Sequence, residues 1–98
     1  MKMTPTQHRE AVGRNIMVVR EALGLAPKQF GAPVGLKSPA LWNIETGTAY
    51  PNLYVLARIC EEYGVTADFI LFGRRGALPR DLANKLAAAE ARLECQVA

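Results

Sequence analysis

The sequence has few of the side chains that metal sites and disulfides use. It holds one histidine, His8, and two cysteines, Cys60 and Cys95, in 98 residues. The cysteines lie far apart, form no CxxC pair and have no histidine nearby, so neither a zinc site nor a disulfide framework is indicated. We expect two free thiols, with Cys60 buried and Cys95 exposed, and neither a metal ion nor a cofactor.

Catalytic patterns are also missing. No pair of acidic residues has a spacing typical of acid–base chemistry, and the GRRG segment at 73–76 is not a phosphate-binding loop because no strand pattern precedes it. The sequence therefore predicts that the protein is not an enzyme.

Long apolar runs are absent as well. The first residues, MKMTPTQHREAVGR, contain no apolar leader, and no stretch approaches the roughly 20 apolar residues that cross a bilayer. We therefore expect a cytoplasmic protein without membrane contact. Half of the residues are apolar, which suffices for one folded domain. The 12 basic and 9 acidic residues give a net charge of +3, which favours a polyanionic partner only weakly.

What the sequence does contain is a series of helical patterns separated by glycine and proline. Helices are expected over about 5–23, 27–34, 39–46, 53–63, 67–72 and from about 79 onward, and no segment alternates as a strand does. Gln7 should form a capping box with the first N-cap. The expected N-caps are Thr4, Ser38, Asn52 and Thr66.

Two prolines in this region have opposite meanings. Pro39 suits the first position of a helix, where its missing N–H has no partner to lose. Pro33 would stand inside the 27–34 helix, at a cost of about 3 kcal/mol. We therefore expect a kink there, or an end at Ala32.

The apolar residues of these helices recur at helical spacing and predict one shared core. The expected inward-facing residues are Val12, Ile16, Val19, Leu23, Phe30, Val34, Leu41, Ile44, Leu53, Leu56, Ile59, Cys60, Tyr63, Phe69, Ile70, Leu82, Leu86, Ala89 and Leu93.

Residues 12–73 resemble the Cro/repressor (XRE) family of helix-turn-helix DNA-binding domains. The resemblance rests on VGRNIMVVREALGL, on Gly35 in the turn, on Leu41 and Ile44 followed by ETG, and on YPNLYVLARICEEYGVTADFIL. It implies an all-α, five-helix, repressor-like bundle whose second and third helices form the helix-turn-helix unit, followed by a C-terminal amphipathic helix. The expected organisation is a DNA-binding domain over 1–73, a basic linker over 74–79 and a C-terminal helix over 80–98.

The same resemblance implies a structural ion pair between Arg20 and Glu45. In the family, an arginine near the end of the first helix commonly pairs with the glutamate of the E-x-G signature. The alternative is an exposed Glu45 with a solvated Arg20.

The DNA contacts that the resemblance implies fall in and around the third helix. They are Lys28, Lys37, Ser38, Pro39, Trp42 and Asn43, with Pro27 at the start of the second helix and Arg14 and Tyr50 as additions. The chain departs from the family where Ala26 and Pro27 replace a small capping residue and glutamine, which removes one phosphate anchor. Asn43 is the best candidate for reading a base, since an asparagine amide matches adenine bidentately. Its alternative is a solvated side chain or one bonded at the helix end.

Three roles stay open for Trp42. It lies against thymine methyls at the groove wall, or covers the crevice over Pro33 and Val34, or anchors a protein partner.

The C-terminal segment also has alternatives. The linker RRGALPR is a solvated connection or a second phosphate-binding arm, and the last helix folds back on the domain or pairs with a second chain.

These features together predict a transcriptional regulator that binds double-stranded DNA sequence-specifically, as a repressor acting by occlusion and as a homodimer on a two-fold site. The alternative is a repressor-like protein-interaction module, such as an antitoxin or adaptor, whose DNA face has turned toward a protein partner.

Overall fold

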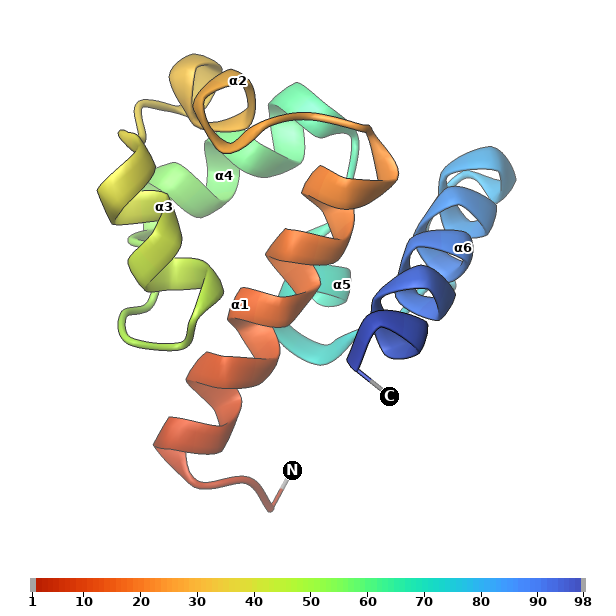
Figure 1. Ribbon diagram of the computed structural model, residues 1–98, viewed down its shortest axis with the longest axis horizontal. Helices are drawn as coiled ribbons and strands as arrows, with labels where there is room; N and C mark the ends of the chain where they lie inside the picture. Colours follow the sequence, from red (N-terminus) through yellow and green to blue (C-terminus); the bar gives the residue numbers. More distant parts are fainter. Residues whose placement is uncertain (1, 98) are drawn as a thin grey trace.

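Residues 2–97 fold into six α-helices and one short 3-10 helix (Figure 1). The computed structural model describes residues 2–97. Met1 of the expected DNA-binding domain and Ala98 of the expected C-terminal helix therefore lie outside the described residues. Within 2–97 there is no strand, which confirms the all-α class. None of these helices combines the length and hydropathy needed to cross a bilayer. The elements are α1 (Pro5–Ala22), α2 (Pro27–Gly31), η1 (Ala32–Val34), α3 (Ser38–Glu45), α4 (Leu53–Tyr63), α5 (Ala67–Phe72) and α6 (Arg80–Val97).

Three of the four expected N-caps are confirmed. Thr4 and Gln7 satisfy one another's backbone N–H groups at 3.1 and 3.0 Å, which is the expected capping box. Asn52 and Thr66 accept hydrogen bonds at the starts of α4 and α5, at 2.8 and 3.1 Å. These bonds satisfy N–H groups that the first helical turn leaves without partners.

Ser38 is not the N-cap of α3, because the helix begins one residue earlier than the sequence predicts. Lys37 has the extended backbone of an N-cap, with φ −80° and ψ 157°, and its carbonyl accepts the first bond of α3 from Leu41 N–H. Ser38 is therefore the first helical residue and Pro39 the second, and no side chain caps α3. Pro39 still costs no hydrogen bond because N–H groups in the first turn have no partner in the helix.

The chain resolves the Pro33 conflict by ending α2 before it. The α-helix stops at Gly31, and Pro33 lies in the first positions of the tighter turn η1. Gly35 then takes φ +78°, and Leu36 N–H donates to the Gly31 carbonyl at 2.9 Å. A Cβ at Gly31 would lie 2.4 Å from the Leu36 carbonyl oxygen, so this reversal needs a glycine there.

Helix α1 runs through the middle of the fold and packs against α3, α5 and α6 (Figure 1). Most of the expected inward residues are buried, from Val12 on α1 to Leu86 on α6. Leu53 is exposed over 84 % of its surface, and five others are partly buried against the core, namely Leu23, Cys60, Tyr63, Leu82 and Leu93. Successive helical residues turn by about 100°, so two positions turn by about 200°. Leu53 therefore points to the opposite side of α4 from Val55, which is buried. Cys60 is only half-buried, and Cys95 is exposed as expected.

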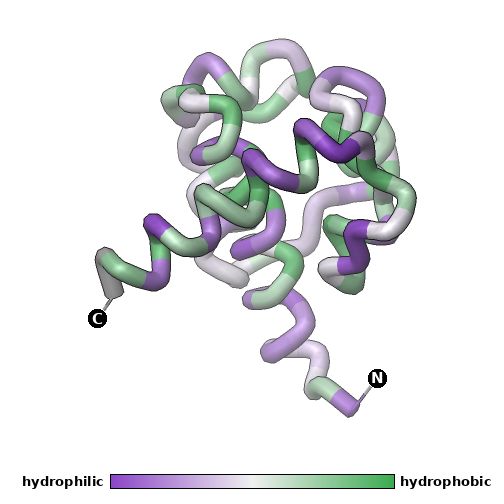
Figure 2. Tube along the Cα trace, turned by 90° about the vertical axis from the view of Figure 1, so that its right-hand side faces the viewer, coloured by the Kyte–Doolittle hydropathy of each residue, from purple (hydrophilic) through white to green (hydrophobic). Residues whose placement is uncertain are grey.

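The C-terminal helix folds back on the domain. Hydrophobic and hydrophilic residues alternate along α6 (Figure 2). Its stripe packs on α1, with Leu86 and Ala89 fully buried. The 74–79 segment is held as well, because Arg75 pairs with Glu90 of α6 and Leu78 is buried. The other residues, Arg74, Gly76, Ala77 and Pro79, are exposed, so the segment is largely solvated and is attached to the fold at two points.

Helix α3 approaches α1 closely where it passes Gly13. A Cβ built on Gly13 would lie 2.1 Å from the Ile44 carbonyl oxygen and 2.8 Å from that of Glu45. The two backbones therefore touch at a residue without a side chain, and this contact sets how closely α3 lies against the fold.

We expect Gly13→Ala to lower the free energy of unfolding by about 1 to 3 kcal/mol, because the added methyl must push α3 off α1. Alanine's better helix propensity offsets this by no more than about 1 kcal/mol. Urea unfolding followed by circular dichroism measures the difference. Gly76→Ala is the matched control, since a Cβ there meets nothing within 4 Å. Equal stability of the Gly13→Ala and wild-type proteins would contradict the assigned contact.

Candidate functional site

Helix α3 presents one buried and one exposed face. Leu41 and Ile44 are buried, with relative exposures of 0 % and 5 %, and they hold the helix on the core. The opposite face carries the side chains that the sequence assigned to recognition. These are Ser38, Pro39, Trp42 and Asn43, and all four are exposed.

An ion pair fixes α3 to α1. Arg20 Nε donates to Glu45 Oε2 at 2.8 Å and Arg20 Nη2 donates to Glu45 Oε1 at 3.1 Å, so the pair is bidentate. Only 12 % and 10 % of the two side chains are exposed. The hydrogen bonds to Glu45 raise the pKa of Arg20. The negative charge of Glu45 raises this pKa further, whereas the burial of Arg20 lowers it. The expected pair is present, and the exposed, solvated alternative is not.

The same arginine also positions the start of α2. Arg20 Nη1 donates to the Leu25 carbonyl at 3.2 Å, just before the helix begins. One guanidinium therefore connects α1, the segment before α2 and the end of α3. This arrangement fixes the relative orientation of the two short helices.

The start of α2 contains a contact that the sequence argument missed. Ala26 N–H donates to Gln29 Oε1 at 2.9 Å. A side chain from inside the helix thus satisfies the N–H of Ala26, while no side chain caps the first turn of α2. The signal was the glutamine three residues after the cap position, which also marked the start of α1.

Lys28 and Lys37 are brought to one side of the molecule. Both are exposed, and both line a hollow between α2 and α3 that we call the turn hollow. Its other lining residues are Ala32, Gly35, Leu36, Ser38 and Pro39. Two cations therefore flank the chain reversal that leads into the exposed face of α3.

Trp42 does not cover the crevice over Pro33 and Val34. It is 64 % exposed, and the hollow beside it is lined by Pro27 and Pro39 along with the Arg20–Glu45 pair. Of the three roles open for Trp42, covering this crevice therefore does not describe the structure. The indole face is open to a partner.

Asn43 lies on the other side of α3, toward α4. It lines a hollow with Tyr50 and Asn52, and its carbonyl accepts the N–H groups of Thr48 and Ala49 at 2.9 and 3.2 Å. Within the described part of the chain its side-chain amide has no hydrogen-bond partner. The loop after α3 is thereby fixed while the amide stays free to bond outward.

The remaining polar chemistry does not form a second centre. No group of three or more His, Cys, Asp or Glu side chains in the described residues is placed to hold a metal ion. Burial raises the pKa of the Cys60 thiol, which makes it a poor nucleophile at neutral pH. The exposed face of α3 is therefore the feature on which a function can be argued.

No family model, curated protein or solved structure matches this chain. The function therefore has to be argued from the residues of α2, η1 and α3 and from the way they are held.

We expect Arg20→Ala to lower the free energy of unfolding by about 3 kcal/mol, because it leaves the largely buried Glu45 carboxylate without its partner. Arg20→Lys should lose less, since it keeps the charge but not the two parallel bonds. Thermal and urea unfolding measure both. An Arg20→Ala protein with an unchanged melting temperature would show that the ion pair does not hold α3.

Proposed function

We propose that this protein is a transcriptional regulator that binds double-stranded DNA sequence-specifically, with α2, η1 and α3 acting as a helix-turn-helix unit on a repressor-like bundle. The observation that carries the proposal is the exposed outer face of α3, which is held on α1 by the Arg20–Glu45 pair and flanked by Lys28 and Lys37. A single α-helix that protrudes from the surface of a domain fits the major groove of B-DNA.

The contacts divide by chemistry. Lys28 and Lys37 neutralise phosphates on either side of the groove, which sets the position but carries no sequence information. Ser38 and Asn43 bond to base edges, with Asn43 matching adenine. Trp42 packs its exposed indole against thymine methyls or sugars, and Pro39 contributes shape alone.

Regulation follows from occupancy. A protein bound over a duplex site blocks that site for other proteins, so this protein acts in the cytoplasm as a repressor by occlusion. A homodimer on a two-fold site would place two copies of α3 in major grooves about one helical turn apart.

One observation favours a second candidate, a protein-interaction module. Trp42, Pro27 and Pro39 border an apolar hollow beside α3, and exposed aromatic residues commonly anchor protein partners. In that case this protein would be an antitoxin or adaptor, and α3 would bind a protein partner in place of the groove.

The dependence of affinity on salt separates the two candidates. If a dimer neutralises four to six phosphates, log affinity should fall against log salt with a slope of about −4 to −5. Lys28→Ala combined with Lys37→Ala removes two contacts per subunit, so the slope should become shallower by about 3 to 4. Fluorescence anisotropy of a labelled duplex measures it.

The matched control is Arg80→Ala combined with Lys85→Ala, which removes two exposed charges from α6. It should leave the slope nearly unchanged. A wild-type slope near zero would favour the protein-interaction module.

Selection from a random duplex pool should enrich a palindromic sequence. With Asn43→Ala, one position per half-site should lose its preference, by about 1 to 3 kcal/mol of discrimination, because the bidentate amide is gone. Stability should be unchanged because the side chain is exposed. Recovery of the same consensus with both proteins would assign base reading to other residues.

A further inference from the structure

Residues 31–36 reverse the chain between α2 and α3, and we call this segment the reversal. In a continued 3-10 turn the N–H of Leu36 would donate to the carbonyl of Pro33, at i→i+3. Gly35 instead turns the chain with φ +78°, and Leu36 N–H donates to the Gly31 carbonyl at 2.9 Å. The Pro33 carbonyl is thereby left free to accept a bond from another part of the chain.

Arg58 of α4 supplies that bond. Helix α4 packs against η1 (Figure 1), and Arg58 Nη2 donates to the Pro33 carbonyl at 3.0 Å. Two carboxylates on the same helix orient the guanidinium, since Glu62 Oε1 lies 3.3 Å from Nη2 and Glu61 Oε1 lies 3.9 Å from Nη1. The charge of Arg58 is therefore engaged within α4, while its bond to Pro33 reaches the reversal.

Tyr63, also on α4, holds the residue just before the reversal. Its hydroxyl donates to the Phe30 carbonyl at 2.5 Å, and the two rings stack with centroids 4.4 Å apart and 7° between their planes. Burial raises the pKa of this hydroxyl and the charge of Glu62 raises it further, so Tyr63 keeps its proton at neutral pH. Helix α4 thus bonds to the backbone at Phe30 and again at Pro33.

These two bonds give the segment a direction that its buried side chains do not. Phe30 and Val34 anchor it in the core, with relative exposures of 0 % and 1 %. Apolar burial is non-directional, whereas a hydrogen bond has a preferred length and angle. Lys37 follows the reversal directly and lines the turn hollow beside α3. Its position therefore depends on how the reversal is oriented.

We propose that Arg58 is a positioning residue: its bond to the Pro33 carbonyl fixes the reversal and thereby places Lys37 beside α3. The inference rests on the proposed function in one respect, because it makes the phosphate contact of Lys37 depend on Arg58. The two residues act on DNA as one unit, through the geometry of the reversal, and the charge of Arg58 adds no separate contact.

Hydrogen exchange of the Leu36 amide tests the hold on the reversal without DNA. This N–H closes the reversal, so it exchanges only when its bond to Gly31 opens. Arg58→Ala should speed the exchange at least about tenfold, since loss of the charged donor makes local opening easier. Arg58→Lys, which keeps the charge and a donor, should recover part of the protection. Exchange in Arg58→Ala at the wild-type rate overturns the proposal.

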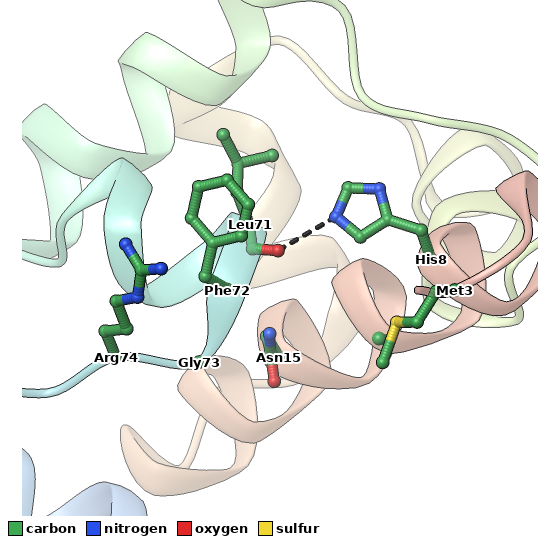
Figure 3. Close-up of a pocket in the computed structure, with 8 residues that line it drawn as sticks. Met3, His8, Asn15, Leu71, Phe72, Gly73 and Arg74 are labelled. Atoms are coloured by element: carbon green, nitrogen blue, oxygen red, sulfur yellow. Dashed lines mark hydrogen bonds between the residues drawn. The ribbon is translucent and has the colours of Figure 1, made fainter. Parts of the chain in front are cut away.

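Asn15→Ala is the matched control, because Asn15 also holds backbone carbonyls but at a different place. Figure 3 shows Asn15 on α1, beside the end of α5, where its amide donates to the Phe69 and Ile70 carbonyls at 3.1 and 2.9 Å. This variant should lose stability, as Arg58→Ala does, and leave the exchange of Leu36 near the wild-type rate. Circular dichroism checks that both variants are folded. An equal acceleration in the two variants would show a general loss of stability and overturns the proposal.

On DNA the test is non-additivity. Fluorescence anisotropy with a random-sequence duplex at low salt gives the affinities of the wild type, Arg58→Ala, Lys37→Ala and the double variant. Arg58→Ala should weaken binding about threefold or more in the wild type, and less than about twofold once Lys37 is already alanine. Equal effects in the two backgrounds would show that Arg58 acts independently of Lys37, which overturns the proposal.

The two proposals fail separately. If the wild type binds no duplex but the Leu36 exchange is accelerated in Arg58→Ala and not in Asn15→Ala, the DNA function fails and Arg58 still positions the segment that carries Lys37. If the wild type binds the duplex but the Leu36 exchange is the same in Arg58→Ala and the wild type, the DNA function stands and the positioning role fails.

Discussion

The structure depends on how α3 is held against α1. At Gly13 the backbones of α1 and α3 lie so close that no side chain fits between them. Further along α1, Arg20 binds Glu45 of α3, with Nε 2.8 Å from Oε2. The first contact sets the depth of α3 and the second sets its direction. Because Arg20 also bonds the Leu25 carbonyl, the beginning of α2 is fixed in the same frame. A helix held in this way can present a fixed set of side chains to a partner, which is what recognition requires.

The same constraint explains why the exposed face can be unusual in composition. Leu41, Ile44 and Glu45 secure the helix from its inner side, so Pro39 and Trp42 on the outer side have no structural task. Donors are few on that face, namely Ser38 and Asn43, and the open indole of Trp42 adds apolar area. The proposed DNA recognition therefore relies on a few hydrogen bonds together with shape, within a frame that phosphate contacts by Lys28 and Lys37 would position.

Local features were readable from the sequence because they depend on neighbouring residues. The Thr4–Gln7 capping box, the caps at Asn52 and Thr66 and the end of α2 before Pro33 follow from bonds within one helical turn. Features that depend on contacts between distant residues could not be predicted from the sequence. Gly13 looks like any glycine in a helix until α3 is placed on it, and Leu53 fits the apolar spacing although its first-turn position points it outward. The attachment of the 74–79 segment needed Glu90 of α6, which no local pattern indicates. In the candidate site, the positions around α3 could be assigned by resemblance, but the place of Trp42 beside Pro27 could not, since it depends on how α2 and α3 meet.

The most direct test of the central claim maps the contact surface itself. Backbone amide resonances of the protein would be followed by NMR while a short duplex of the selected sequence, or a random-sequence duplex at low salt, is added. The account predicts that the largest shifts fall on residues 35–43 and near Lys28, with the outer face of α6 unaffected. Shifts confined to α6 or to the hollow lined by His8, Phe72 and Arg74, or no shifts at all, would contradict the assignment of α3 as a DNA-reading helix.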